Sequence, residues 1–472
     1  MSSSRAYELG FQSLDVELSN RRLPVDGEIP SWLSGALIHN GPGRFEIGGE
    51  RVTHWFDGLG MLRRYGFEDG SVYFSNRFLR TDARRRALDG DRSGEFATAP
   101  GLIELATRWI RSLGPPEPTD NANVHVARFD DRFVALTEAP RAVEFDPNSL
   151  ETRGAFEFTD DIETHLRTAH LASCPDGTAV GLGLRFGRTS RYHVFEIPPN
   201  STERNLLATI PADGPGYVHD IAATAEHVVF VEPPLRIALS RVLKPGNDGL
   251  LDALVYDDTR QSRIVVVDRA DGSVVVDETI DPFFVFHHIN AYEAADRIVL
   301  DSVTFEDADI LDALTLDALG GDAFELAPPG QYERFEIGLD GSISRRRCHT
   351  GGLELPTVTQ SVRGRKHRYV YAQATDRQGA NGLLKFDSRT ESATEWWSNG
   401  VYVEEPQMIQ RPDAEGPDDG VVLAPALDTD AKRTTLLVFD AETLSLRARA
   451  PLPHAVPFGF HSRFFEDLPA TT

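Results

Sequence analysis

Four histidines share a sequence context that could place them around one metal ion. Each ends an apolar or aromatic segment, and the four segments are widely spaced along the chain: His170, His219, His287 and His461. Four neutral imidazoles suit a borderline metal such as Fe(II), Cu or Zn. Zinc with four closed ligands would be structural, whereas iron accepts further ligands and would leave positions open for dioxygen. The spacing alone does not choose between these metals.

The pair His287–His288 follows the apolar run "FFVF", which predicts a buried strand. Successive side chains of a strand point to opposite faces, so only one of the two rings can reach a shared centre. The other must pack or form a hydrogen bond elsewhere. His54 has a tryptophan neighbour and is expected to do the same. Other histidines stand beside charged or turn residues or alternate in strands, which favours structural or solvated roles: His39, His125, His193, His227, His349, His367 and His454.

A repeated hairpin could bring distant histidines together. Seven times, a strand ends near an acidic residue, a tight polar turn follows, and a second strand begins; several turns contain Asp-Gly, a strong hairpin signal. The acidic residues are Glu68, Asp146, Glu196, Asp268, Asp340, Asp387 and Asp440. The repeat predicts an all-β fold, a seven-bladed β-propeller, because radial repetition hides sheet edges. The alternative is a set of hairpins in two β-sandwiches. In a propeller, histidines at the same end of four inner strands would converge on the axis.

Two long insertions interrupt this pattern, near 83–120 and 233–255, and both are expected between repeats. We expect a single propeller domain over 1–472, with loops and short helices forming a cap over the axial site. Apolar residues in 102–113 fall close to helical spacing. The insertions could pack as ordinary caps. Alternatively, 102–113 and 235–243 could touch a membrane peripherally or form the mouth of an apolar tunnel.

The amino-acid composition argues against several classes of function and of cellular location. Among 472 residues, 73 acidic and 48 basic side chains give a formal net charge of −25, which should repel nucleic acid and anionic headgroups. Only four residues are lysine, and this scarcity beside many carboxylates suggests a protein kept soluble at high salt. Cys174 and Cys348 are too few for a disulfide framework or a thiolate metal site. No signal-peptide core or long apolar run is present, so we expect a cytoplasmic protein, with peripheral membrane contact as an option.

An ordered set of motifs resembles the carotenoid cleavage oxygenase family from about residue 13 to 465. The motifs include "IPSWLSGALIHNGPGRFEIG", "HWFDGLGML", "NRFLRTD", "TDNANVHV", "ALTEAP" and the four histidine segments. His39 stands where the family usually has arginine. The resemblance implies a seven-bladed propeller with a non-haem Fe(II) on its axis, and it makes His287 rather than His288 the ligand. The four ligands that it implies are His170, His219, His287 and His461.

The resemblance also implies three glutamates behind the ligands. They are Glu138 in "ALTEAP", Glu354 in "GGLELPTV" and Glu405 in "YVEEPQM", where Glu404 is the competing neighbour. A carboxylate that accepts the distal ring N–H fixes the imidazole tautomer and makes it a better donor to a metal. From the residues alone, each of these glutamates would be read as a solvated surface residue.

The reaction implied is oxidative cleavage of a conjugated C=C bond, with O2 as co-substrate and an apolar polyene held in a tunnel. No protein base is expected, and a carotenoid or apocarotenoid is the expected substrate, with β-carotene to retinal as the specific case. Stilbene-cleaving members tend to carry a lysine and a tyrosine where this chain has Thr137 and Phe78, which argues against hydroxystilbenes. The alternatives are a retinoid-type isomerase, a stilbene-cleaving member, a non-catalytic pigment-binding propeller and a zinc-stabilised scaffold.

Overall fold

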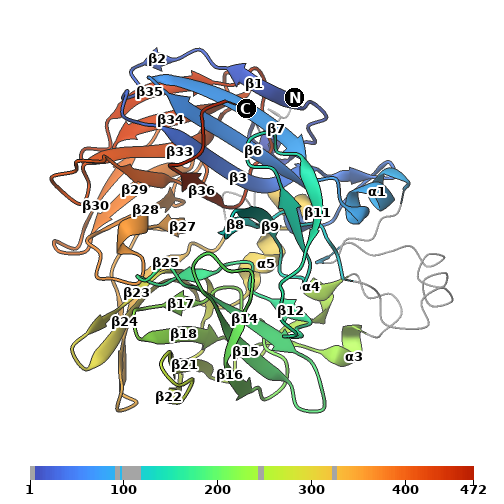
Figure 1. Cartoon of the computed structure of the whole chain (residues 1–472), viewed down its shortest axis with the longest axis vertical. Helices are drawn as coiled ribbons and strands as arrows, with labels where there is room; N and C mark the ends of the chain where they lie inside the picture. Colours follow the sequence, from blue (N-terminus) through green and yellow to red (C-terminus); the bar gives the residue numbers. More distant parts are fainter. Residues whose placement is uncertain (1–5, 91–95, 98–117, 243–248, 321–326, 472) are drawn as a thin grey trace.

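Seven β-sheets of four to six strands, called blades 1 to 7 in chain order, surround a common centre (Figure 1). The structure is a computed structural model, and it describes residues 6–90, 96–97, 118–242, 249–320 and 327–471. The prediction of an all-β, seven-bladed propeller is therefore confirmed.

The first four blades run in hydrogen-bonded order from an outer strand to the strands nearest the centre. Blade 1 holds β1 (Leu18–Arg22), β7 (Ser71–Phe78), β6 (Leu59–Glu68), β3 (Gly35–Arg44) and β36 (Ser462–Phe465). Blade 2 holds β11 (Thr152–Phe156), β10 (Ala142–Phe145), β9 (Arg132–Leu136) and β8 (His125–Phe129). Blade 3 holds β16 (Asn205–Pro211), β15 (Arg191–Ile197), β14 (Ala179–Arg185), β12 (Leu166–Arg167) and β13 (Ala172–Ser173). Blade 4 holds β22 (Val274–Ile280), β21 (Ser262–Asp268), β18 (His227–Glu232) and β17 (Ala222–Ala223).

The other three blades follow the same plan. Blade 5 holds β26 (Ile343–Arg347), β25 (Gln331–Gly338), β24 (Arg297–Phe305) and β23 (Phe284–Ala294). Blade 6 holds β30 (Ser392–Trp396), β29 (Gly382–Asp387), β28 (Tyr369–Ala374) and β27 (Leu353–Thr357). Blade 7 holds β2 (Asp26–Gly27), β35 (Leu446–Pro451), β34 (Arg433–Asp440), β33 (Gly420–Asp428), β31 (Val401–Val403) and β32 (Gln407–Gln410).

All seven predicted hairpins form the two outer long strands of a blade. In blade 1, for example, β6 pairs with β7 from Met61↔Phe78 to Glu68↔Ser71. The turn places Asp69 and Gly70 at φ values of 47° and 71°, the left-handed region that Asp-Gly tolerates. Middle strands lie between neighbouring blades and are buried on both faces, so they read as continuous apolar runs. The segment Ile264–Val267 in β21, for example, has no exposed surface.

Both ends of the chain close the ring. The C-terminal strand β36 pairs with β3 of blade 1 from Ala36↔Phe465 to His39↔Ser462. Near the N-terminus, β2 pairs with β35 of blade 7 through Asp26↔Arg449 and Gly27↔Ala448. The first and last blades are thus each completed by a strand from the opposite end of the sequence.

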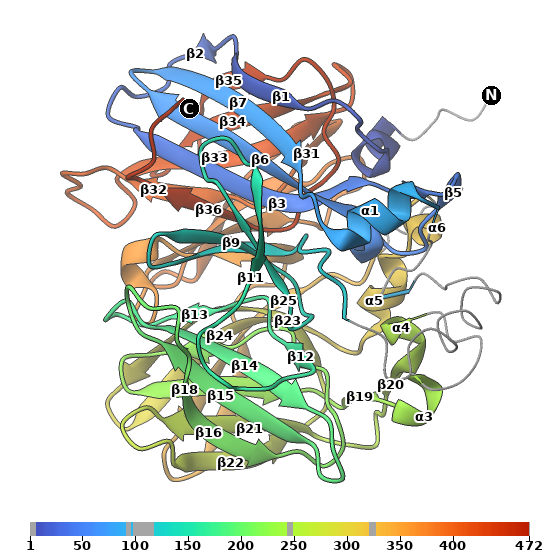
Figure 2. The same cartoon turned by 45° about the vertical axis from the view of Figure 1, so that its right-hand side comes forward.

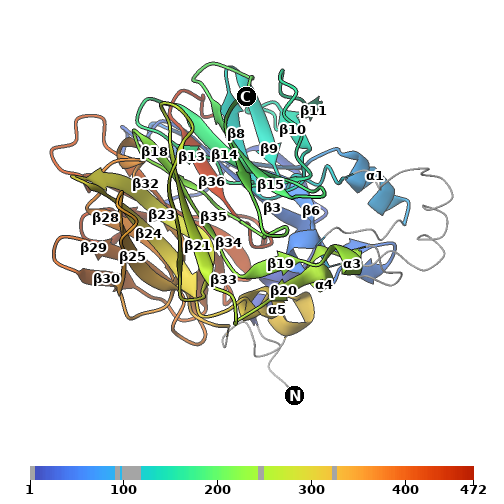
Figure 3. The same cartoon turned by 90° about the horizontal axis from the view of Figure 1, so that it is seen from below.

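Short helices and a two-stranded sheet gather on one side of the ring (Figures 2 and 3). They include α1 (Asp82–Leu88), α3 (Leu239–Val242), α4 (Leu250–Ala253), α5 (Asp309–Ala313), α6 (Leu316–Leu319), β19 (Leu235–Ile237) and β20 (Leu254–Tyr256). The remaining short elements are η1 (Ala6–Phe11), η2 (Trp55–Asp57), η3 (Gln360–Val362), β4 (Glu46–Ile47) and β5 (Glu50–Arg51). None of the helices in the described ranges has the length and apolar character needed to cross a bilayer.

The prediction that 233–255 lies between repeats is wrong. Its elements β19, α3, α4 and β20 fall between β18 and β21, which pair with each other inside blade 4. The hairpin repeat marks only the two outer strands of a blade, so an insertion that precedes the hairpin within the same blade leaves no trace in it. Leu235 and Ile237 are buried in the core and offer no surface to lipid. The segment 102–113 lies outside the described residues, and its membrane contact stays a prediction.

Candidate metal centre

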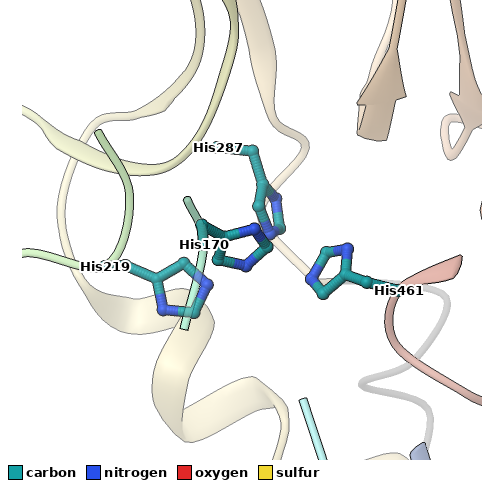
Figure 4. Close-up of side chains that lie close together, drawn as sticks. All are labelled: His170, His219, His287 and His461. Carbon is teal, nitrogen blue, oxygen red and sulfur yellow. The ribbon is translucent and has the colours of Figure 1, made fainter. Parts of the chain in front are cut away.

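The structure brings the four predicted histidines together at the centre of the ring. Their ligand nitrogens all lie within 4.8 Å of one another (Figure 4). His170 lies between β12 and β13, His219 precedes β17, His287 lies in β23, and His461 directly precedes β36. Each therefore comes from the start of the innermost strand of a different blade, namely blades 3, 4, 5 and 1.

A break in strand register separates the two rings of the His287–His288 pair. In β23 the pairing with β24 shifts between Val285↔Thr304 and His288↔Ser302, so the strand bulges at His287. The His287 ring reaches Glu354, with Nδ1 2.7 Å from Oε2. The His288 ring turns away, and its Nδ1 lies 2.8 Å from Oγ of Ser302. The expectation that only one ring reaches the centre is confirmed.

Three glutamates stand behind three of the histidines, each at hydrogen-bond distance from Nδ1. Glu138 Oε1 lies 2.6 Å from His219, Glu354 Oε2 lies 2.7 Å from His287, and Glu405 Oε1 lies 2.9 Å from His461. Each carboxylate accepts the Nδ1–H proton, so the Nε2 lone pair of that ring is free for a metal. Among the described residues, no carboxylate forms such a bond to His170.

Each carboxylate is itself held in place. The Tyr217 hydroxyl donates to both oxygens of Glu138, at 2.8 and 3.0 Å. The backbone N–H of Leu355 donates to Glu354 at 2.6 Å. Glu405 Oε2 accepts from the N–H and hydroxyl of Ser462 at 2.6 and 2.7 Å and from Gln407 at 3.0 Å.

Glu404, the alternative candidate to Glu405, forms different contacts. Its carboxylate accepts the backbone N–H of Gly459 at 2.5 Å and lies 4.0 Å from both Arg63 and His39. It therefore supports the turn that leads into His461 without touching the His461 ring.

Burial and mutual proximity set the charge of the rings. Burial, reinforced by the neighbouring histidines, lowers the pKa of His170 and His461 well below the usual imidazole value, so both are neutral donors. Burial also lowers the pKa of His287, but the Glu354 carboxylate outweighs it, and the pKa ends above its usual value. Burial raises the pKa of Glu405 to about 7.

The donor set fits a metal ion. Nε2 of His170 and Nε2 of His287 are both buried and have no hydrogen-bond partner among the described residues. A buried polar atom without a partner costs free energy, and a shared cation would satisfy both nitrogens at once. Four imidazoles with carboxylates behind three of them form a site that could hold a borderline divalent metal.

The two sides of this centre differ in polarity. One side is formed by residues that come just before the histidines in the chain. Phe286 directly precedes His287, Phe460 directly precedes His461, and both rings contact Phe56 of η2, at centroid distances of 6.4 and 5.4 Å. Phe96 adds a ring 5.1 Å from Phe56. His54, behind these rings, is held by a hydrogen bond from Nε2 to the Leu311 carbonyl of α5, so the expectation of a packing role is confirmed.

The other side is formed by residues that come just after the histidines in the chain. It contains a cavity of about 120 Å³, called the axial cavity below. Its wall follows the innermost strands beyond each histidine and is rich in polar groups. The polar lining residues include Ser173, Asp220, His288, Asn290, Arg363 and Gln407.

His125 also lies beside the centre, although its sequence context favoured a structural or solvated role. It begins β8, the innermost strand of blade 2, and its ring lies 5.5 Å from His461 and 5.4 Å from His170. Its Nδ1 accepts the backbone N–H of Val126 at 2.6 Å, and burial lowers its pKa to about 3. Its position at the start of an innermost strand, shared with the four others, is the signal that could have found it.

The fold and site define a class of protein: a seven-bladed propeller with a four-histidine, carboxylate-supported site on its axis. Residues 11–466 match the family described as retinal pigment epithelial membrane protein, and the chain belongs to that family. The resemblance to carotenoid oxygenases is confirmed by its relatives. A carotenoid isomerooxygenase from Galleria mellonella is 30% identical over 475 residues, covering 93% of this chain and 92% of that protein. The β,β-carotene 15,15'-dioxygenase of Mus musculus is 26% identical over 516 residues, covering 97% and 91%.

Solved structures agree with the sequence relatives. Cobalt-substituted Synechocystis apocarotenoid oxygenase matches with a TM-score of 0.88 at 26% identity, covering 98% of this chain and 99% of that one. The chain therefore belongs to a family that includes carotenoid- and apocarotenoid-cleaving dioxygenases.

Proposed function

We propose that this protein is a non-haem iron dioxygenase that cleaves a conjugated C=C bond of a carotenoid or apocarotenoid. The observation that carries the proposal is the convergence of His170, His219, His287 and His461 within 4.8 Å, with Glu138, Glu354 and Glu405 behind three of them. The names of the relatives support the substrate class, and the cobalt form of a similar structure supports a divalent metal at this position.

Bound iron would supply the redox chemistry that joins O2 to the broken bond, so that each alkene carbon becomes a carbonyl and both oxygen atoms are consumed. The side chains of the protein supply the metal ligands and their positioning. The four imidazoles, from blades 1, 3, 4 and 5, would hold the metal, and the three carboxylates keep their partner rings in one tautomer. No general base is needed for this bond change, and no group in the described residues is assigned that role.

The aromatic side of the centre suits the polyene. Phe286 and Phe460 lie one residue before two of the ligands, and the Phe286 ring is 5.0 Å from the ring of His219. A flat conjugated chain packs well against such rings, and exclusion of water there strengthens every polar contact of the site. We infer that this aromatic wall sets the position of the polyene relative to the metal, and therefore which double bond is cleaved.

The test is metal analysis after anaerobic purification, followed by aerobic incubation with β-carotene and shorter apocarotenals and chromatography of the products. About one iron per chain and new aldehydes would support the proposal, and the product lengths would place the cut. Zinc in place of iron, or no metal, would contradict it.

A second candidate, cleavage coupled to double-bond isomerisation, is favoured by the name of the Galleria mellonella relative. The geometry of the recovered aldehydes separates the two: all-trans products from an all-trans substrate indicate cleavage alone, and cis products indicate coupling. Isomerised substrate with no aldehyde would indicate the retinoid-type isomerase, and an intact pigment bound without turnover would indicate the non-catalytic propeller.

A further inference from the structure

One segment of blade 6, residues 359–366, contributes to the wall of the axial cavity and is named the plug loop. Arg363 and Gly364 line the cavity. Gln360, Ser361, Arg365 and Lys366 face outward and are exposed. The plug loop therefore has one face on the cavity and the other on solvent.

The plug loop is fixed to blades other than its own. The Asn290 amide of blade 5 donates to the carbonyls of Val362 and Arg365 at 3.1 and 2.8 Å, and its oxygen accepts the Gly364 N–H at 2.9 Å. The Arg365 guanidinium donates to the Pro175 carbonyl of blade 3 at 3.3 Å. The loop thus crosses the axis instead of staying within blade 6.

Gly364 shows how closely the crossing is packed. Its φ is +70°, and a Cβ there would lie 2.7 Å from Cδ of Pro175. Only glycine meets both conditions without a shift of the loop.

Arg363 is the cationic group that the plug loop directs at the centre. Among the described residues, no hydrogen bond or ion pair reaches its guanidinium. The carboxylates of Glu405 and Asp220 are close enough to raise its pKa, and burial lowers the pKa by more. Those carboxylates are already taken by other donors: Ser462 for Glu405, and the backbone N–H groups of Ile221 and His288 for Asp220. The Arg363 charge therefore stands in the cavity without a direct counter-ion.

The two sides of the centre are unequal as paths for a hydrated divalent cation. On the other side of the centre, the described residues include the rings of Phe56, Phe286 and Phe460, and a cation passing among these rings would lose its water without replacement from them. The axial cavity offers the side-chain oxygens of Gln407 and Ser173.

We propose that the axial cavity is the route by which the metal enters and leaves the four-histidine site, and that Arg363 is an electrostatic gate on that route. The inference rests on the metal centre of the proposed function but not on its substrate or reaction. A positive charge in a confined passage repels a passing cation in both directions, because low-dielectric walls strengthen the repulsion. The gate slows release of a bound metal, and it slows loading equally.

The experiment measures how fast bound Fe(II) passes to an excess of a coloured ferrous chelator, under anaerobic conditions and without substrate. Arg363→Met removes the charge and keeps the apolar stem. We expect release at least about tenfold faster than in the unaltered protein, which corresponds to a barrier lowered by about 1.4 kcal/mol. Loading of the metal-free variant with Fe(II) should accelerate by a similar factor.

The two rates together separate a gate from a damaged site. Removal of a nearby positive charge cannot weaken a bound cation electrostatically, so a gate predicts faster release and faster loading with an equilibrium Kd that is unchanged or lower. A damaged site predicts faster release, unchanged loading and a higher Kd, and that result would overturn the proposal.

Lys366→Met is the matched control, because it removes the same charge from the exposed face of the same loop. Its rates should equal those of the unaltered protein, and equal acceleration in both variants would overturn the gate in favour of a general surface-charge effect. Arg363→Lys should restore slow exchange. Unchanged rates in Arg363→Met would overturn the gate alone, whereas an unaltered protein that takes up no Fe(II) would overturn the metal centre and the route with it.

Discussion

At the scale of single residues, the four histidines differ in what stands behind each ring. His219, His287 and His461 each meet a glutamate through Nδ1, and His170 does not. Three carboxyl groups behind four imidazoles favour a divalent cation over an empty site, because a bound cation would stabilise the ionised form of each carboxyl group. The site is therefore organised in advance for a metal.

Replacement of His287 by alanine should remove the metal and all turnover while the propeller stays folded. The ring lies at the bulge in β23, and the strand keeps its pairing with β24 on both sides of it. Metal content per chain, measured beside far-ultraviolet circular dichroism and turnover, checks the result. His288→Asn is the control, because that ring bonds to Ser302 and should not be needed for metal retention. Full metal content in the His287 variant would contradict the ligand assignment.

Replacement of Glu354 by glutamine should weaken metal binding by roughly 10- to 100-fold, the usual cost of losing a carboxylate behind a ligating imidazole. Glutamine keeps an acceptor oxygen for His287 but removes the charge. Titration of the metal-free protein with Co(II), followed by its visible absorption, gives the affinity. Glu336→Gln, in a partly exposed pair with Arg297, should leave it unchanged. Equal affinity for both variants would show that the Glu354 charge does not support the site.

At the scale of elements, neighbouring blades are joined by buried polar contacts as well as by apolar faces. Asp301 in β24 of blade 5 accepts two bonds from Arg334 at 2.7 and 2.8 Å and one from the Tyr332 hydroxyl at 2.9 Å. His367, which precedes β28 of blade 6, lies 3.3 Å from the same carboxylate. The four groups hold blades 5 and 6 in register without any exposure of Asp301.

Asp301→Asn should lower the free energy of unfolding by about 3–5 kcal/mol at neutral pH, because it leaves Arg334 without its counter-ion in a largely buried position. Burial raises the pKa of Asp301, but the bonds from Arg334 and His367 outweigh it and lower the pKa below 3.8. A carboxyl with a lowered folded pKa contributes stability that is complete above its unfolded pKa and lost as pH falls through the folded one.

The stability gap between the unaltered protein and Asp301→Asn should therefore stay constant from pH 7 to about 5 and narrow only below about 4. Urea unfolding of both proteins across this range measures it. A gap that closes already near neutral pH would show that another group, not Asp301, carries the pH dependence.

The element scale also shows which parts of the fold the sequence could predict. The seven outer hairpins were recognisable because Asp-Gly and similar turns repeat at their tips, as at Asp69–Gly70. The four histidines were recognisable because an apolar segment leads into each one. The plug loop left no such pattern, since its position depends on contacts from Asn290 and Pro175 in other blades. The local sequence does not indicate contacts with residues that are distant in the chain.

The site residues, too, could be predicted only where the local sequence marks them. Glu354 and Glu405 became candidates through the family resemblance, since neither the five-residue strand β27, which holds Glu354, nor the short loop that holds Glu405 is long enough for a periodicity that would mark a carboxylate as buried. His125 was missed because it lies within an alternating segment, between Val124 and Val126, and does not end an apolar run, although it occupies the same strand position as the four histidines of the centre. Strand position within a blade is thus a better predictor of proximity to the axis than the apolarity of the preceding segment.

At the scale of the whole molecule, a formal charge of −25 is spread over one closed ring of blades. Like charges held at fixed spacing repel one another, and that repulsion opposes the compact state. The internal contacts must overcome this repulsion at low salt, when the Debye length reaches about 30 Å.

The melting temperature should therefore rise between about 0.01 and 1 M NaCl, where the Debye length falls to about 3 Å. Differential scanning fluorimetry over this range tests it, with NaCl and KCl compared to exclude a specific ion. A melting temperature that falls or stays level would remove the basis for expecting adaptation to high salt.

Ring closure has a consequence for how the protein is made. His461 is joined directly to β36, the strand that completes blade 1 and the ring. During translation, a chain that has released His170, His219 and His287 still lacks His461, and its first blade still lacks an inner strand. The complete four-histidine cluster and the closed ring therefore form only after synthesis has passed residue 465, so a nascent or truncated chain lacks both.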